Sequence, residues 1–434
     1  MSKGKAALCL ALAVFFLIGI VCVSGCADSS VTADGKTRIE VISYKQEAVQ
    51  AMSQIQDNFN ATHDDIELVI DSPNDAVTII KTRLIRENYP DIIAIGGDMT
   101  YASFLDSNMF MNIEDCPAVS ECKPTYMEML DALELIPVEG VYALPYMANA
   151  AGVLYNVDMF NEYGWQIPNT WDEFVALMQE IEADGVLPLY FGFKDSWTCL
   201  APWNAIAAST ADLDLAMQVN SGEAKFSEEY QIVAEEMQEL MKYCEPDPVA
   251  YGYNDACTAF ANGQSAMFVI GNYAIPQIRS VNPDMNIGSF TFPAMDTYED
   301  NKLNSGIDLQ FCVMAAKEDR KDAIYEVLDY FYDDSTIQVY LDDQGGIPCK
   351  EGDFAIPDEL KDMTDYIVTS DMADYQDHHY PSEMSVDALI QTFLLDNSSN
   401  AAETFLNNFD TEWIRYNRDT IAKLEEYNAS QGGN

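Results

Sequence analysis

Segments typical of strands and of helices alternate along residues 38–95, and this alternation restricts the fold more than any other feature of the sequence. Short apolar runs are followed by amphipathic stretches, such as the one that spaces Met52, Ile55 and Phe59 at three- and four-residue intervals. The strands are predicted at 38–43, 66–70 and 91–95, and the helices at 46–60 and 75–86. The order strand, helix, strand, helix, strand predicts a parallel, doubly wound α/β sheet.

A second set of such elements begins after residue 140. Thr170 and Glu173 have the spacing of a capping box, which predicts a helix that starts directly after Thr170. Further strands are predicted at 187–193, 266–270 and 309–315, and further helices at 228–243, 255–262, 319–332, 386–395 and 401–427. A chain of 434 residues with 48% hydrophobic side chains can bury two cores, so two domains are expected.

Residues 1–25 have the layout of a secretory signal peptide. Two lysines precede an apolar, uncharged run at residues 6–23, and small residues then lead to Cys26 in the sequence Val-Ser-Gly-Cys. This tetrapeptide resembles a lipobox, so the signal is predicted to be cleaved and Cys26 to carry a diacylglyceryl group at the outer face of the cell membrane. The small polar residues of 26–36 would form a tether. A plain transmembrane anchor is the alternative, because the apolar run is long enough to span a bilayer.

The charge balance excludes one class of partner. Lys and Arg number 22 against 72 Asp and Glu, a formal net charge of −50, and such a field repels nucleic acid. The ordinary interpretation is a solvated acidic surface that keeps the protein soluble, and a cationic ligand is the alternative.

Cysteine and histidine spacing does not match a metal site. No Cys-x-x-Cys pair occurs, and the histidines, at positions 63, 378 and 379, are far from any cysteine cluster, so neither a metal nor a cofactor is predicted. Most of the cysteines after Cys26 lie in apolar runs, which is typical of buried free thiols. Cys116 and Cys122 flank a short loop and suggest a disulfide, and the doublet at 378 and 379 suggests an exposed loop.

Polar and aromatic residues follow several of the predicted strands. In open α/β sheets ligands bind outside the carboxyl ends of the strands, and the sequence has Asp98 after one strand and the pair Asp195 and Trp197 after another. Gly96 and Gly97, just before Asp98, are equally consistent with a tight turn. The binding residues are therefore expected at these strand ends.

Several longer segments match a known family, and their order and spacing make the match specific. They are 90–93 (Pro-Asp-Ile-Ile), 142–146 with 152–160, 168–174 (Pro-Asn-Thr-Trp-Asp-Glu-Phe), 259–267, 271–273 and 345–348 (Gly-Gly-Ile-Pro). From residue 38 to about residue 427 the chain resembles the extracellular solute-binding proteins of ABC importers, in the carbohydrate branch that includes maltose-binding proteins. It departs from the pattern at Tyr273, where relatives often carry a stacking tryptophan, and at Gly96-Gly97, where relatives place bulk.

The resemblance implies a fold of the type II periplasmic-binding-protein kind, with two doubly wound α/β lobes joined by crossing hinge strands and a ligand cleft between them. It assigns residues 37–147 and 295–344 to the N-terminal lobe and residues 148–294 and 345–430 to the C-terminal lobe. The crossings are expected near 147–150, near 293 and near 345, and the protein is expected to be a monomer.

The resemblance also implies a ligand and its binding residues. The ligand is expected to be a small polar solute, an oligosaccharide or another sugar, that is passed to the transmembrane subunits of an ABC importer. A sugar has hydroxyls that donate and accept and apolar C–H faces, so its site needs carboxylates and amides beside flat aromatic rings. The residues expected to bind it are Tyr44, Lys45, Gln46, Asp98, Asn149, Asp195, Trp197, Tyr273, Asp308 and Gln310.

Alternatives stay open for single residues and for the function. Lys45 and Gln46 would suit a solvated loop equally well, Trp165 and Trp171 are expected to pack in the core, and Trp203 and Trp413 fit either role. The same fold could hold a cationic solute such as a polyamine among its aspartates. A secreted glycoside hydrolase needs two carboxyl groups facing one bond, but the sequence contains no G-x-S-x-G, H-E-x-x-H or P-loop pattern, so no enzyme is expected.

Overall fold

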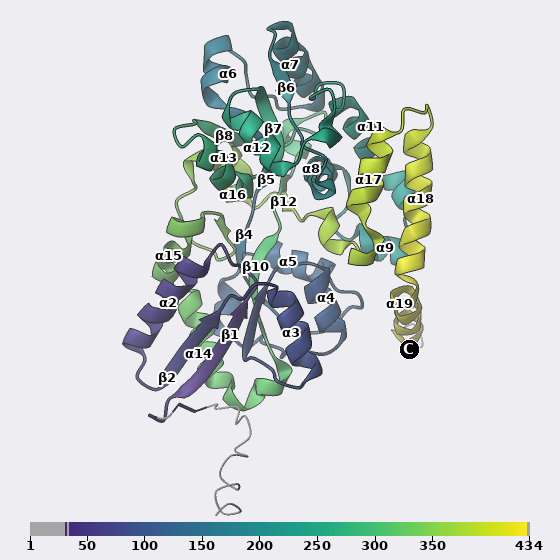
Figure 1. Ribbon diagram of the computed structural model, residues 1–434. Helices are drawn as coiled ribbons and strands as arrows, with labels where there is room; N and C mark the ends of the chain where they lie inside the picture. Colours follow the sequence, from purple (N-terminus) through teal and green to yellow (C-terminus); the bar gives the residue numbers. More distant parts are fainter. Residues whose placement is uncertain (1–30, 33, 432–434) are drawn as a thin grey trace, which may run out of the picture.

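The computed structural model describes residues 31–32 and 34–431, which fold into two α/β lobes stacked one above the other (Figure 1). The predicted signal peptide, Cys26 and the first part of the tether lie outside the described residues. Among the residues that are described, no helix combines the length and the apolar character needed to cross a membrane.

The first lobe is built on a sheet with the strand order β11-β4-β10-β3-β1-β2. Its strand β1 pairs in parallel with both β2 and β3, as the alternation of strands and helices predicts. The strand β10 arrives from the other lobe and runs antiparallel to β3 and β4. The bounds are β1 (Thr37–Ser43), β2 (Ile66–Asp71), β3 (Ile92–Ile95), β4 (Leu144–Ala148), β10 (Ile307–Val313) and β11 (Ile347–Pro348).

Helices cover both faces of this sheet, and its central strands are therefore apolar on both sides. Successive residues of a strand point to opposite faces. In β3, Ile92 belongs to the hydrophobic core formed with α2, α14 and α15, whereas Ile93 belongs to the core formed with α3, α4 and α5. The bounds are α2 (Val49–Thr62), α3 (Ala76–Ile85), α4 (Met99–Asp106), α5 (Pro124–Ala132), α14 (Lys321–Phe331) and α15 (Asp334–Gln344).

The second lobe is built on a sheet with the order β12-β9-β5-β7-β6, and β8 also pairs with β5. Trp203 and Trp413, which the sequence left undecided, are fully buried in its core, and Trp165 is buried there as well. The strands are β5 (Ala151–Asn156), β6 (Leu187–Leu189), β7 (Ser265–Gly271), β8 (Ile287–Phe290), β9 (Leu303–Asn304) and β12 (Met372–Ala373). The helices are α6 (Val157–Tyr163), α7 (Trp171–Ala183), α8 (Leu200–Thr210), α9 (Leu215–Ser221), α10 (Phe226–Glu229), α11 (Gln231–Leu240), α12 (Tyr253–Ala261), α13 (Ile275–Val281), α16 (Thr364–Thr369), α17 (Val386–Leu395), α18 (Ala401–Tyr416) and α19 (Arg418–Gln431).

Within residues 34–431 the chain passes between the two sheets three times. The first passage, between β4 and β5, lies where the sequence predicts it. The second lies between β9 and β10, at Ser305 and Gly306, which is later than the predicted position near residue 293. The third follows β11, which still belongs to the first sheet, so it is also later than predicted. The lobe boundaries as a whole stay a prediction.

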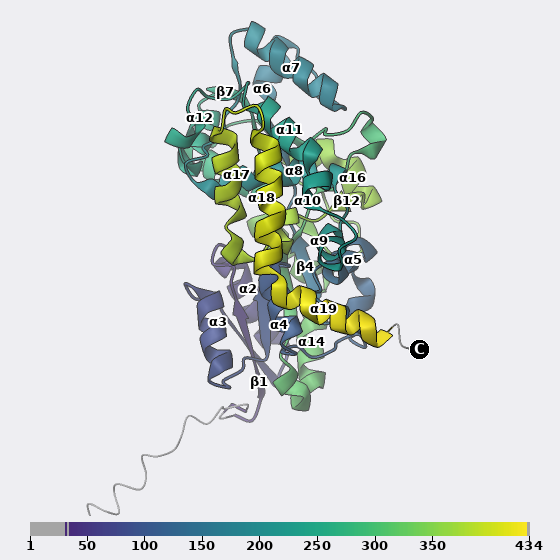
Figure 2. The same cartoon turned by 90° about the vertical axis from the view of Figure 1, so that its right-hand side faces the viewer.

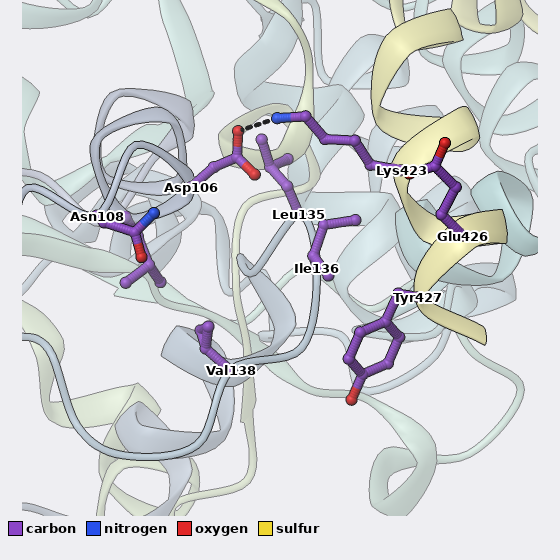
Figure 3. A pocket seen from close by; sticks show the side chains of 9 residues that line it. Asp106, Asn108, Leu135, Ile136, Val138, Lys423, Glu426 and Tyr427 are labelled. Carbon is purple, nitrogen blue, oxygen red and sulfur yellow. Dashed lines mark hydrogen bonds and ion pairs between the residues drawn. The ribbon is translucent and has the colours of Figure 1, made fainter. Parts of the chain in front are cut away.

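The C-terminal helix α19 extends from the second lobe to the side of the first lobe (Figure 2). Lys423 of α19 forms an ion pair of 2.7 Å with Asp106 at the end of α4. Beside this pair lies a pocket of about 430 Å³, which Leu135, Ile136 and Tyr427 help to line (Figure 3). The sequence predicts one helix over 401–427, whereas the chain turns at Asn417 between α18 and α19. The turn lets Trp413 stay in the second core while α19 reaches the first lobe.

The disulfide suggested by the sequence is wrong. Cys116 and Cys122 are buried free thiols, as Cys199, Cys257, Cys312 and Cys349 also are, and the half-buried Cys244 is free too. The sulfur of Cys116 faces Asp329, at 3.9 Å from its Oδ1, and the sulfur of Cys122 faces the carbonyl oxygen of Lys123 at 3.7 Å. The two thiols therefore have separate surroundings.

Candidate functional site

The first lobe contributes a cluster of polar side chains at the carboxyl ends of β1 and β3. The Tyr44 hydroxyl donates to the backbone oxygen of Asp308 at 2.6 Å, and the Lys45 ammonium forms an ion pair of 2.6 Å with the Asp308 carboxylate. Burial raises the pKa of Tyr44, and the charges of Asp308 and Asp98 add to this effect. The structure thus brings together Tyr44, Lys45 and Asp308, with Asp98 close enough to act on Tyr44.

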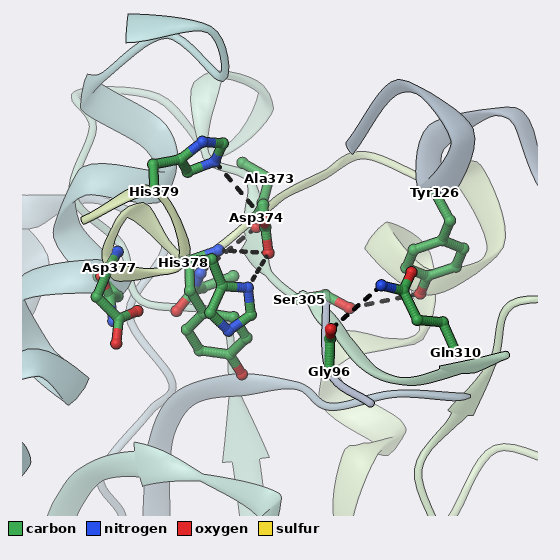
Figure 4. A network of polar contacts seen from close by, with 12 residues as sticks. Gly96, Tyr126, Ser305, Gln310, Ala373, Asp374, Asp377, His378 and His379 are labelled. Atoms are coloured by element: carbon green, nitrogen blue, oxygen red, sulfur yellow. Dashed lines mark hydrogen bonds and ion pairs between the residues drawn. The ribbon is translucent and has the colours of Figure 1, made fainter. Parts of the chain in front are cut away.

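Gln310 lies next to this cluster on β10 and is completely buried. Its amide nitrogen donates to the backbone oxygen of Gly96 at 3.1 Å (Figure 4). Its amide oxygen has no hydrogen-bond partner within the described part of the chain. A buried acceptor without a partner is costly, and in this conformation the amide of Gln310 is closed to solvent.

The remaining first-lobe candidates lie further from the ion pair. Asp98 is the N-cap of α4 and accepts a hydrogen bond from the backbone nitrogen of Thr100 at 2.7 Å. Asn149 lies in the first passage between the lobes, where its backbone nitrogen donates to the oxygen of Gly306 at 3.2 Å. Gln46 is exposed and reaches only the backbone oxygen of Pro73, so the structure does not bring it into the cluster.

The second lobe contributes a row of aromatic rings. Trp197 is 41% exposed and lies against Tyr253, with ring centroids 5.0 Å apart. Burial raises the pKa of Tyr253, and interactions with Cys257 and Tyr273 raise it further. Tyr273 is therefore close to Tyr253. Tyr273 is 37% exposed, and its ring folds back over Gly271, where a Cβ atom would lie 2.2 Å from the ring. We call Trp197, Tyr253 and Tyr273 the aromatic row.

Asp195 fixes one end of this row. Its carboxylate accepts a hydrogen bond of 2.7 Å from the backbone nitrogen of Tyr253, at the start of α12. A carboxylate at a helix N-terminus is stabilised by the unpaired N–H groups there. Asp195 is itself exposed, and it holds Tyr253 in position beside Trp197.

The segment after β12 carries site residues that the sequence interpretation missed. The short 3-10 helix Gln376–His379 follows Tyr375, and the Asp374 carboxylate contacts both histidines of this helix (Figure 4). Burial raises the pKa of Tyr375, and Tyr273 and Asp308 raise it further, so this residue is near both of them. Its hydroxyl has no hydrogen-bond partner among residues 34–431.

The histidine doublet predicted to lie in an exposed loop is instead part of this polar network. His379 is buried and His378 is half-buried, with its Nδ1 2.8 Å from Asp374 Oδ1. Burial acts to lower the pKa of His378, but Asp374, Asp377 and Asp98 oppose this and raise it to about 10. His378 is therefore a cation at neutral pH. The backbone at Gly306 passes close to the Asp374 side chain. Only a glycine fits there, because a Cβ atom at residue 306 would lie 2.3 Å from Asp374 Oδ1.

The two lobes face one another across a pocket of about 410 Å³. Asp98 at the start of α4 lines one side, and Asp377 with Tyr380 lines the other. Of the residues expected to bind the ligand, Asp98 alone is among the described residues that line this pocket, so the aromatic row and the Lys45–Asp308 pair lie outside it. Asp98 also contributes to the raised pKa of Asp377, after burial and Asp374, so charges of both lobes act on one another here. A volume of this size is within the range of small-molecule sites. In the part of the chain that is described, no group of three or more His, Cys, Asp or Glu side chains could hold a metal ion.

The family model for bacterial extracellular solute-binding proteins matches residues 40–336, which is more than half of the chain. The chain belongs to this family. A curated relative, the multiple sugar-binding protein of Streptococcus mutans, is 28% identical to this solute-binding protein over 328 residues, covering 73% of this chain and 76% of the relative.

Solved structures of similar proteins have the same fold. The apo form of RafE from Streptococcus pneumoniae is 24% identical to this chain. The alignment covers 87% of this chain and 97% of RafE, with a TM-score of 0.76. The solute receptor AcbH is 18% identical, covers 86% of this chain and 98% of that chain, and superposes with a TM-score of 0.74. At these identities the likeness concerns the fold, and the two-lobe expectation of the sequence is confirmed.

Proposed function

We propose that this solute-binding protein holds a sugar, in particular an oligosaccharide, between its lobes and delivers it to the transmembrane subunits of an ABC importer. The observation that carries the proposal is the aromatic row, in which Trp197 and Tyr273 are 41% and 37% exposed, together with the polar cluster of Tyr44, Lys45 and Asp308 on the other lobe. Aromatic faces suit the C–H faces of a sugar, and the polar atoms suit its hydroxyls. The S. mutans relative is named a multiple sugar-binding protein, which agrees with this ligand class.

The charges of the site favour a neutral ligand over a polyamine. Asp308 is already paired with Lys45, and Asp374 is paired with His378. These two carboxylates are therefore not available to neutralise a ligand cation without breaking an existing pair. A sugar, which carries no charge, can bind beside both pairs.

Capture requires that the ligand contacts both lobes. A ligand that binds the closed state more tightly than the open state shifts the protein toward closure. For this motion we propose the predicted lobes with two changes. Residues 295–304 would belong to the second lobe, which the pairing of β9 with β5 and β12 supports, and residues 345–348 would belong to the first lobe, which the pairing of β11 with β4 supports. Tyr375, near both Tyr273 and Asp308, lies where contacts from both lobes would meet.

Calorimetric titration of the mature protein is expected to show binding of at least one oligosaccharide and no binding of spermidine between the lobes. The panel would include raffinose, stachyose, chitin oligosaccharides, and malto-, xylo- and manno-oligosaccharides, because neighbouring structures carry raffinose and stachyose or are named for chitin oligosaccharides. Incubated sugars should be recovered intact. Heat with none of these sugars, or hydrolysis of any of them, would contradict the proposal.

We further propose that Cys26 carries a lipid that anchors the protein at the outer face of the membrane. A diacylglyceryl group has two acyl chains, which are enough for a stable anchor. The variant Cys26→Ala is expected to lose lipid modification and membrane retention, as measured by metabolic labelling with a palmitate analogue and by fractionation. The matched control is Cys22→Ala, inside the predicted signal peptide, which should be processed normally. Equal membrane retention of both variants would refute the anchor.

A further inference from the structure

The second lobe has a second hollow, at its end away from the first lobe. Residues of helices α7 and α11 and residues 294–296 line an open pocket of about 500 Å³. Figures 1 and 2 show where α7 and α11 lie in the second lobe. Its acidic lining residues are Asp172, Glu235, Glu236, Glu239 and Asp296. No lysine, arginine or histidine is among the described residues that line it. Its character is thus strongly anionic, unlike that of the site between the lobes, where Lys45 and His378 balance carboxylates.

Glu236 is the residue that distinguishes this pocket from an ordinary acidic surface. It is only 6% exposed, and its Oε2 atom has no hydrogen-bond partner among the residues described. Burial raises the pKa of Glu236 to about 9, and the charges of Asp296 and Glu235 add to the effect. At neutral pH these surroundings therefore favour the protonated form of Glu236.

A second buried glutamate of the same lobe, Glu245, has a structural role and serves as a comparison. Glu245 is 3% exposed, and its carboxylate accepts hydrogen bonds of 3.0 to 3.1 Å from the backbone nitrogens of Phe191 and Gly192. Those bonds hold a loop in place and satisfy the charge. The carboxyl group of Glu236 has no comparable partner within residues 34–431, so it is available to a ligand.

Two of the other acids in the pocket already have polar partners. Glu239 pairs with Lys242 at the surface, and Glu235 accepts a hydrogen bond from Gln231. Asp172 comes from the start of α7, and Asp296 from the loop after β8. Trp171 and Ile232 supply apolar surface at the same pocket. Carboxylates beside an aromatic ring suit an organic cation. The carboxylates would pair with its charge, and the apolar side chains would contact its carbon stem.

We propose that this pocket is a second binding site, separate from the sugar site, which takes an alkylammonium or guanidinium group as the ionic partner of Glu236. The group can come from a free polyamine or from a lysine or arginine side chain of another protein. Metal ions are a poorer match, because no cluster of described side chains has an arrangement that could hold one. Binding would ionise Glu236 and release its proton.

The test is calorimetric titration of the full protein, saturated with its sugar, at pH 8 in two buffers of different ionisation enthalpy. The probes are spermidine and a short peptide rich in lysine and arginine, with the same peptide acetylated on its lysines and with citrulline in place of arginine as the neutral comparison. We expect binding of at least one cationic probe with release of nearly one proton. The stronger of the two probes identifies the source of the cationic group.

Variants separate this site from the rest of the acidic surface. Glu236→Gln should weaken the cationic probe at least tenfold and abolish proton release, and Asp296→Asn should weaken it less. The matched control is Glu182→Gln, which makes the same replacement at an exposed glutamate at the end of α7 outside the pocket and should leave binding of the probe unchanged. Melting temperatures of all variants would establish that each is folded.

Three results would overturn the proposal. One is the absence of heat with both cationic probes at millimolar concentration. Another is equal weakening by Glu236→Gln and Glu182→Gln, which would indicate nonspecific attraction. The third is binding that is lost in Trp197→Ala but kept in Glu236→Gln, which would move the cation to the site between the lobes. Because sugar binding is measured separately, failure here leaves the proposed sugar function untouched.

Discussion

Replacing Trp197 by alanine is expected to weaken sugar binding about thirtyfold while leaving the fold almost unchanged. Aromatic anchors in a binding pocket commonly contribute about 2 kcal/mol, which corresponds to roughly this factor. Trp197 is 41% exposed and contacts Tyr253 of the aromatic row, so little core packing is lost with it. Affinity measured by calorimetry and the free energy of unfolding measured in urea would be compared on the same variant.

The matched control is Tyr298→Ala. Tyr298 is 37% exposed and packs against one aromatic neighbour, Tyr366, at 5.2 Å, but it is not part of the aromatic row. It should bind sugar like the unmodified protein. A Trp197 variant that melts at much lower temperature, yet binds with full affinity in its folded fraction, would remove this residue from the site.

Replacing Asp374 by alanine is expected to lower the free energy of unfolding by about 3 kcal/mol, because it leaves the half-buried His378 without its nearest counter-charge. Asp374 is 1% exposed, lies 2.8 Å from the ring of His378 and accepts the backbone nitrogen of Tyr375 at 2.8 Å. Sugar binding should fall as well, since Tyr375 would lose this support. Unfolding in urea at pH 7 measures the first effect.

The ion pair of Asp374 and His378 also predicts how the free energy of unfolding depends on pH. The pKa of His378 is raised from 6.5 to about 10 in the folded protein, so its contribution is complete below pH 6.5 and is lost as the pH rises toward 10. Asp374→Ala should lose most of this part of the pH dependence. The control is Asp371→Ala, an exposed acid nearby, which should change stability by about 0.5 kcal/mol or less. Equal stability of the two variants would contradict a stabilising network.

The elements with a clear period could be predicted from the sequence, and the short ones could not. In β3 four consecutive apolar residues indicate a strand covered on both faces, and Ile92 and Ile93 do lie in different cores. In contrast, β9 and β12 have two residues each, which is too short for any alternation to be visible. The second passage between the lobes follows β9, and its expected position near residue 293 came from the family resemblance, because no local pattern marks so short a strand.

The site could be predicted only in part, for a similar reason. Tyr44 and Asp308 are 264 residues apart, and it was the family resemblance, not any local pattern, that put both among the candidates. Tyr375, Asp377 and His378 were missed because they lie in a 3-10 segment without periodicity. A signal was nevertheless present, since the run Asp-Tyr-Gln-Asp-His-His-Tyr at 374–380 concentrates polar and aromatic residues to a degree unusual for a solvated loop.

Helix α19 is expected to make ligand release depend on ionic strength. It is continuous with the second lobe, but its Lys423 is paired with Asp106 of the first lobe, so the lobes cannot separate on that side without parting the two charges. Lys423 is 57% exposed, and such a pair contributes less than about 1 kcal/mol and is screened by salt. We therefore expect the residence time of a bound ligand to shorten by up to about fivefold as ionic strength rises, although the ligand does not touch this ion pair.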